Sequence, residues 1–241
     1  MDEATWLNCT DTQPMLDFLK GKASERKLRL FAAACCRRIW HLLHEAFRHA
    51  VVTSERFADR LADDREKMEA YREAILRQQI QRREQFSAAY AGRAAIFALT
   101  TSDSEYPASY RASRTSNEVA WIISWSEELH SPVGSSDDAL QQIAQRELQM
   151  HAHLLRDLFG NPFRAITVAP TWRTLTVTTL ATAAYEERAL PTGTLDADRL
   201  AVLADALEDA GCTDEQLLVH LRETSPHVRG CWVIDLLLGK E

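Results

Sequence analysis

The chain has 241 residues, of which 46% are hydrophobic and 26% are charged, a composition that excludes a wholly disordered protein. Its formal net charge is −7, which argues against a dedicated nucleic-acid-binding domain, because such domains usually carry a basic excess. Glycine and proline are scarce, at 8 and 7 residues, which favours helices over a turn-rich all-β fold.

The N-terminal fifth of the chain predicts two helices. A short one covers residues 12–20 and ends near Gly21. Ser24 then caps a longer helix over residues 24–50, in which apolar residues recur every three or four positions and form one core-facing stripe. The polar side of this helix is basic, and it supplies the candidate binding residues Arg26, Arg37, Arg38, Arg48, His41 and His44.

The next segment mixes acidic and basic residues and is rich in strong helix formers. Residues 55–86 contain neither glycine nor proline. We expect one long, largely exposed charged helix over about 54–99, with a break near Gly92, that projects as a helical arm or hairpin.

Two loops and two helices follow. Residues 101–116 are expected to form a loop, and the spacing Thr115-x-x-Glu118 predicts a capping box at the start of the next helix. Trp121 and Trp125 lie four positions apart in that helix, which favours burial in the core over an exposed interface anchor. A second loop is expected over 131–137, followed by a helix over 137–159 that ends at Gly160.

The C-terminal third predicts four more helices. Residues 170–189 are rich in threonine, but their apolar residues keep a helical spacing, so a helix is favoured over a strand. The other three are expected over 196–210, over 214–222 after the Thr213-x-x-Gln216 capping box, and over 226–238 after Ser225–Pro226.

These patterns predict an all-α fold, an irregular multi-helix bundle with a long charged helix or helical hairpin arm. We expect a single domain over 1–241, with 1–50, 51–100 and 115–241 as its sub-parts. No stretch approaches the roughly 18–20 apolar residues of a membrane span, so no membrane partner is expected.

The chain has five cysteines, an odd number that cannot all pair in disulfides within it, and its acidic first residues lack the apolar core of a signal peptide. Reduced thiols and a cytoplasmic location are therefore expected.

Four stretches carry a resemblance to a known group of proteins. They are Thr10–Leu43, Leu154–Arg164, Leu203–Leu218 and His227–Glu241. Together they resemble an expanded bacterial family of paralogues. The resemblance implies a bacterial cytoplasmic protein, and it implies no activity, cofactor or site residue.

Two weak constellations could carry chemistry. Zinc requires four tetrahedral ligands, which the C-terminal region could supply from Cys212, His220, His227 and Cys231. Their spacing matches no recognised zinc motif, so structural roles are favoured and no metal is expected. Arg146 with His151 or His153 matches the Arg-x4–6-His pattern of ribonucleases of the HEPN kind, in which a histidine would transfer a proton.

No established catalytic motif is present. The chain lacks a glycine-rich phosphate loop, a G-x-S-x-G elbow and an H-E-x-x-H pair, and no cofactor is expected. The favoured function is a non-enzymatic protein–protein interaction or regulatory module with a protein partner of unknown identity. The first alternative is the HEPN-like ribonuclease. The second is a nucleic-acid-associated accessory protein that binds through the basic face of 24–50, although that face could instead meet the acidic segment 196–215.

Overall fold

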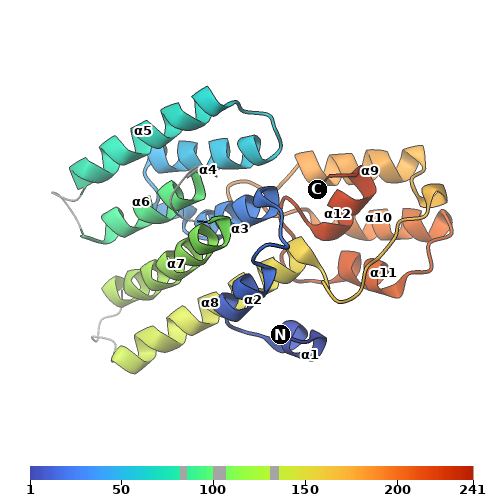
Figure 1. Cartoon of the computed structure of the whole chain (residues 1–241), viewed down its shortest axis with the longest axis horizontal. Coiled ribbons are helices and arrows are strands. Elements are labelled where there is room, and N and C mark those ends of the chain that lie inside the picture. Colours follow the sequence, from blue (N-terminus) through green and yellow to red (C-terminus); the bar gives the residue numbers. More distant parts are fainter. Residues whose placement is uncertain (82–85, 100–106, 131–135, 241) are drawn as a thin grey trace. The chain divides into compact units, whose positions relative to one another are not determined.

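The structure is a computed structural model that describes residues 1–81, 86–99, 107–130 and 136–240. These residues form twelve α-helices and two short 3₁₀ helices (Figure 1), and their only β-type pairing is two isolated bridges that join Ala189, Thr194 and Val228. The predicted all-α fold is therefore confirmed. Among the described residues, no helix combines the length and the apolar character that crossing a membrane requires.

The chain divides into two compact units. The first contains Met1 and Asn8–Ala152, and the second contains Asp2–Leu7 and His153–Glu241. The division falls within the helix α8 (Asp137–Phe159). The expected single domain over 1–241 stays a prediction, and each unit is described by itself.

The first unit is built around α3 (Glu25–Arg38), which packs against α4 (Glu45–Ala58), α6 (Phe86–Leu99) and α7 (Ala108–His130). Helix α5 (Asp64–Gln81) packs against α4 and α6, which also pack against each other. Phe31 of α3 and Phe47 of α4 are completely buried. The unit also contains α2 (Thr12–Leu19), which packs against α7.

The helix predicted over 24–50 is two helices. Ser24 caps α3 as expected, because its Oγ accepts a hydrogen bond from the backbone N–H of Lys27. However, α3 ends at Arg38 and is followed by a 3₁₀ turn, η1 (Trp40–Leu42). His44 then begins α4 by accepting a hydrogen bond from the N–H of Ala46 through its ring Nδ1. A histidine cap of this kind is not among the usual capping residues, so the sequence did not indicate the break.

The single long helix expected over 54–99 is not present, because the segment contains the end of α4, then α5 and α6. The alternative of a helical hairpin agrees better, since α5 and α6 pack against each other. Arg60, between α4 and α5, has a positive φ of 59°. Asp63 and Glu66 form a reciprocal capping box at the start of α5, with each side chain accepting from the other's backbone N–H. The break expected near Gly92 does not occur, because Gly92 lies inside α6. A side chain there would clash with the Phe47 ring, which lies directly against the glycine.

The capping box predicted at Thr115 is a third error. Helix α7 begins earlier, at Ala108, and Thr115 lies inside it, where its hydroxyl donates a hydrogen bond to the carbonyl of Arg111. The loop expected over 101–116 is wrong over 108–116, which belong to α7, while 101–106 lie outside the described residues. Most of the loop expected over 131–137 also lies outside them, and Asp137 begins α8. Helix α8 runs from Asp137 to Phe159 as predicted, and Gly160 follows it with a positive φ of 63°.

The second unit packs four helices around its own apolar core. Helix α9 (Leu175–Glu186) lies against α10 (Ala197–Asp209) and α12 (Trp232–Leu238). Helix α10 also lies against α11 (Glu215–Arg222). Two further pieces are most of α1 (Glu3–Asn8) and the 3₁₀ turn η2 (Pro170–Trp172). Within this unit, the Trp6 side chain is completely buried and donates its indole N–H to the carbonyl of Gly160.

A helix is present within 170–189 as predicted, but it is shorter: α9 covers Leu175–Glu186 after η2, and the Thr174 side chain caps it. The helix over 214–222 is also present, but its N-cap is Asp214, not Thr213. The helix predicted over 226–238 is wrong over its first half. Residues 226–231 are not helical, and Val228 bridges to Thr194, so only Trp232–Leu238 form α12.

Candidate functional site

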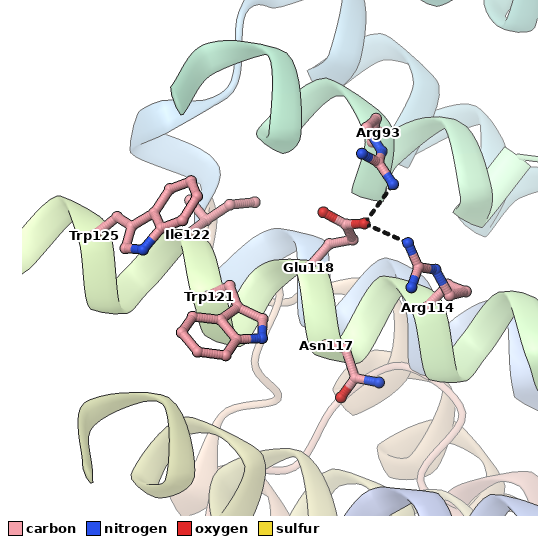
Figure 2. Close-up of a pocket in the computed structure, with 7 residues that line it drawn as sticks. All are labelled: Arg93, Arg114, Asn117, Glu118, Trp121, Ile122 and Trp125. Atoms are coloured by element: carbon pink, nitrogen blue, oxygen red, sulfur yellow. Dashed lines mark hydrogen bonds and ion pairs between the residues drawn. The ribbon is translucent and has the colours of Figure 1, made fainter. Parts of the chain in front are cut away.

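The first unit carries a groove along α7 with a volume of about 620 Å³. Helix α7 supplies all but one of its lining residues, and α6 supplies Arg93. Figure 2 shows that the groove has a charged end, at Glu118, and an apolar stretch further along α7. The complete lining is Arg93, Arg114, Asn117, Glu118, Trp121, Ile122 and Trp125.

Trp121 is the most unusual residue of this groove, because 50% of its surface is exposed. The prediction that it lies in the core is wrong, while Trp125 is half-buried and Ile122 is buried. Trp121 is exposed because a different face of α7 is buried, since α7 packs against α3 and α6. That buried face has a small residue at every fourth position: Ala112, Ser116, Ala120 and Ser124.

Two arginines share one carboxylate at the charged end of the groove. Glu118 Oε1 lies 2.8 Å from Arg93 Nη2 and 2.9 Å from Arg114 Nη2 (Figure 2). Glu118 is buried, whereas about a third of each arginine side chain is exposed. Both guanidinium groups lie at the end of the groove that adjoins the tryptophans. The groove therefore offers an apolar surface beside two partly exposed arginine side chains.

The basic face predicted over 24–50 is largely neutralised within the first unit. Three of its arginines pair with carboxylates: Arg26 with Asp59, Arg37 with Glu55, and Arg38 with Glu147. These carboxylates come from the end of α4, from its middle and from α8. The sequence did not reveal these pairs, because each partner is at least 18 positions away along the chain.

The other predicted binding residues do not gather into a cationic site. Arg48 donates a hydrogen bond to the carbonyl of Trp40 and lies over its ring. His44 serves as the cap of α4, and His41 is exposed in η1. In the acidic segment 196–215, Asp205 and Glu208 bind Arg222.

The structure buries one histidine of the ribonuclease pattern and leaves the other, with Arg146, exposed. His151 is completely buried, with Nδ1 2.9 Å from the hydroxyl of Ser116 and Nε2 3.0 Å from Glu147 Oε1. Burial lowers the pKa of His151 and favours its neutral form, although Glu147 opposes this effect. Arg146 and His153 are both exposed on α8, and burial together with Arg156 lowers the pKa of His153.

Three of the four predicted metal-ligand candidates come together in the second unit. His220, His227 and Cys231 form a cluster there with Asp157, which the sequence did not single out. Burial works to raise the pKa of Asp157, but hydrogen bonds from the two histidines outweigh it and hold that pKa well below its usual range. The fourth candidate, Cys212, follows α10 and does not belong to this cluster.

Sequence spacing could not have indicated Asp157, which is 63 positions from His220 and lies in an ordinary amphipathic helix. The only local signal is a carboxylate at position 157 between the buried residues Leu155 and Leu158.

Comparisons of the chain with models of known protein families, with curated proteins and with solved structures find no match.

Proposed function

We propose that this chain is a non-enzymatic helical interaction module that binds a protein partner in the groove along α7. The observation that carries the proposal is the exposed Trp121, held beside Trp125 and a pair of arginines. Tryptophan and arginine are the residues most enriched among those that dominate binding energy in protein interfaces.

The energy available at this position is substantial. Covering the exposed half of a tryptophan, whose full surface is roughly 250 Å², removes about 120 Å² of mostly apolar surface from water. At about 25 cal/mol per Å², this contributes about 3 kcal/mol to binding before the cost of association is counted. One such anchor is enough to dominate a small interface.

The lining of the groove supports a proposal about the chemistry of the partner. Trp121, Ile122 and Trp125 favour an apolar or aromatic side chain, and Arg93 with Arg114 favour a carboxylate. We therefore propose that the bound segment carries an apolar anchor with an aspartate or glutamate a few residues away. The neutralised arginines of the α3 face support a protein partner over a nucleic acid, since phosphate binding relies on unpaired basic side chains. The regulatory role, the cytoplasmic location and the bacterial family membership stay predictions.

Selection of random peptides displayed on phage against the immobilised full chain tests this function. We expect the enriched peptides to share an apolar or aromatic residue close to an acidic one. They should bind Trp121→Ala roughly tenfold or more weakly than the original chain. The matched control is Leu175→Ala, which removes another exposed large apolar residue, 84% exposed, outside the groove. Enriched peptides that bind Trp121→Ala as tightly as the original chain would contradict the proposal.

A further inference from the structure

The second unit brings four different metal-binding side chains to one point. Asp157 lies in the last turn of α8, His220 in α11, His227 in the segment after α11, and Cys231 at the start of α12. One ligand atom from each lies within 4.8 Å of the other three. Segments that are distant in the sequence therefore converge on one small volume.

The distances within this cluster are close to those of a tetrahedral metal site. His220 Nε2 lies 3.2 Å from Cys231 Sγ and 3.2 Å from Asp157 Oδ1, and His227 Nδ1 lies 2.7 Å from the same Asp157 oxygen. Ligands held about 2.0–2.3 Å from a zinc ion stand about 3.3–3.8 Å apart. Side-chain rotations that move these atoms by less than about 1 Å would convert the present cluster into a tetrahedral zinc site.

The remaining polar atoms of the cluster already have partners that would orient the ligands. Asp157 Oδ2 accepts a hydrogen bond of 2.8 Å from the N–H of Val228, which leaves Oδ1 for a metal. His227 Nε2 lies 3.4 Å from the carbonyl of Glu223, and His220 Nδ1 lies 3.9 Å from its carboxylate. Metal-binding histidines almost always direct their second ring nitrogen to a carbonyl or carboxylate in this way.

Burial and charge also fit a divalent cation. The side chains of Asp157 and His227 are 5% and 2% exposed, and Cys231 is fully buried. Burying isolated charges is costly, but a divalent ion with one carboxylate and one thiolate is neutral as a group. Cys231 is also too deeply buried to attack a substrate, so its approach to His220 does not make a nucleophilic pair.

We propose that Asp157, His220, His227 and Cys231 form a zinc site in the second unit. Two imidazoles, one thiolate and one carboxylate are ligands that zinc accepts, and four protein ligands are typical of a structural site. The ion would join α8, α11 and the segment before α12, and its binding would contribute to the stability of the unit. This inference goes beyond the proposed interaction and does not depend on it.

A path to the site is present. A cavity of about 550 Å³ in the second unit is lined by Asp157 and His220 of the cluster, and by neighbours that include His153 and Trp232. The side chain of His220 is 11% exposed, the most of the four ligands. A metal ion can therefore reach the cluster from this cavity without unfolding of the unit.

Cys212 provides a matched control within the same unit. Cys212 is 4% exposed and is therefore buried like Cys231, but it lies outside the cluster. A serine at position 212 therefore removes a buried thiol and leaves the proposed ligands intact. A serine at position 231 removes a buried thiol and one ligand.

Metal content of the full-length, untagged chain tests the proposal. After dialysis against zinc and removal of the excess, we expect one zinc ion per chain by elemental analysis, for the original chain and for Cys212→Ser. Cys231→Ser and His227→Gln should each bind zinc at least roughly tenfold more weakly than the original chain. A chain that retains no zinc, or a Cys212→Ser variant that loses as much zinc as Cys231→Ser, would overturn the proposal.

Cobalt binding to the original chain keeps the test decisive even if the ligand variants do not fold. Co²⁺ added to the chelator-treated chain should give the visible absorption of tetrahedral cobalt together with a thiolate-to-cobalt charge-transfer band. Cys212→Ser should give the same spectrum. Absence of the thiolate band from the original chain would also overturn the proposal, because Cys231 is the only cysteine in the cluster.

Discussion

Arg37 and Glu55 form a buried, two-pronged ion pair that joins α3 to α4 in the first unit. Arg37 Nε lies 2.6 Å from Glu55 Oε1, and Arg37 Nη2 lies 2.7 Å from Oε2. Each side chain is only 4% exposed. An arginine that the sequence assigns to an exposed basic face is therefore part of the interior, where it pairs with a buried carboxylate.

Removal of that carboxylate should strongly destabilise the chain. Glu55→Gln removes the carboxylate that forms the two-pronged pair with the buried Arg37, and we expect the free energy of unfolding to fall by about 3–5 kcal/mol. Urea unfolding followed by circular dichroism measures the loss. The control is Glu73→Gln, which breaks the exposed pair with His49 and should change stability by less than about 1 kcal/mol. Equal losses in the two variants would contradict the assignment.

Stability should fall in acid because of Glu147. Burial works to raise the pKa of this carboxyl, but hydrogen bonds and charge from Arg38 and His151 outweigh it and lower the pKa from 4.5 to about 2. A carboxyl with a lowered folded-state pKa stabilises the fold above its unfolded pKa. The contribution, about 1–3 kcal/mol, is therefore complete above about pH 4.5 and is lost as the pH falls toward 2.

Urea unfolding of Glu147→Gln at several pH values checks this dependence. The stability difference between the original chain and this variant should be larger at pH 6 than at pH 3. Glu73→Gln, which changes an exposed carboxyl, should show little such change. A difference for Glu147→Gln that is the same at both pH values would show that the Glu147 carboxyl does not titrate as described.

Gly160 should tolerate a side chain poorly. Its φ is +63°, and an added Cβ would stand 3.0 Å from the ring of Trp232. Gly160→Ala therefore combines backbone strain with overpacking and should cost about 2–4 kcal/mol. Gly211→Ala, at φ +85° with no atom within 4 Å of the added Cβ, carries the strain alone and should cost about 1 kcal/mol. Thermal unfolding compares the two, and equal costs would mean that the Trp232 contact has no effect.

The tryptophans should divide into structural and functional classes. Trp6 is completely buried with its indole N–H bonded to Gly160, so Trp6→Ala should cost about 3–5 kcal/mol. Trp121 is half exposed, and Trp121→Ala should cost less than about 1 kcal/mol. Urea unfolding of the two variants measures both values. A large loss from Trp121→Ala would show that this side chain is needed for folding, and would remove the reason to regard it as a binding anchor.

The sequence predicted the helical fold well, because local patterns decide whether a segment becomes a helix. Ser24 and Gly160 begin and end helices as expected, through a side-chain acceptor and a left-handed backbone. The errors arose where a distant contact or an unusual cap decided the boundary. Thr115 has the spacing of a capping box but lies buried inside α7, and His44 acts as a cap although histidine rarely does.

The sites were predicted less well, since they depend on which segments meet. His220, His227 and Cys231 could be named from their residue types, but Asp157 became visible only in three dimensions. In the same way, Trp121 could not be distinguished from a core residue by its spacing to Trp125. The small residues at every fourth position of α7, among them Ala112 and Ala120, were the missed signal.

Photo-crosslinking from position 121, in cells that naturally express the chain, tests the proposed interaction most directly. A benzophenone side chain placed there should give a discrete crosslinked adduct. Mass spectrometry should map that adduct to a partner segment with an apolar residue near an acidic one, and the same probe at the exposed position 175 should not give it. No adduct from position 121, or the same adducts from both positions, would contradict binding in the α7 groove.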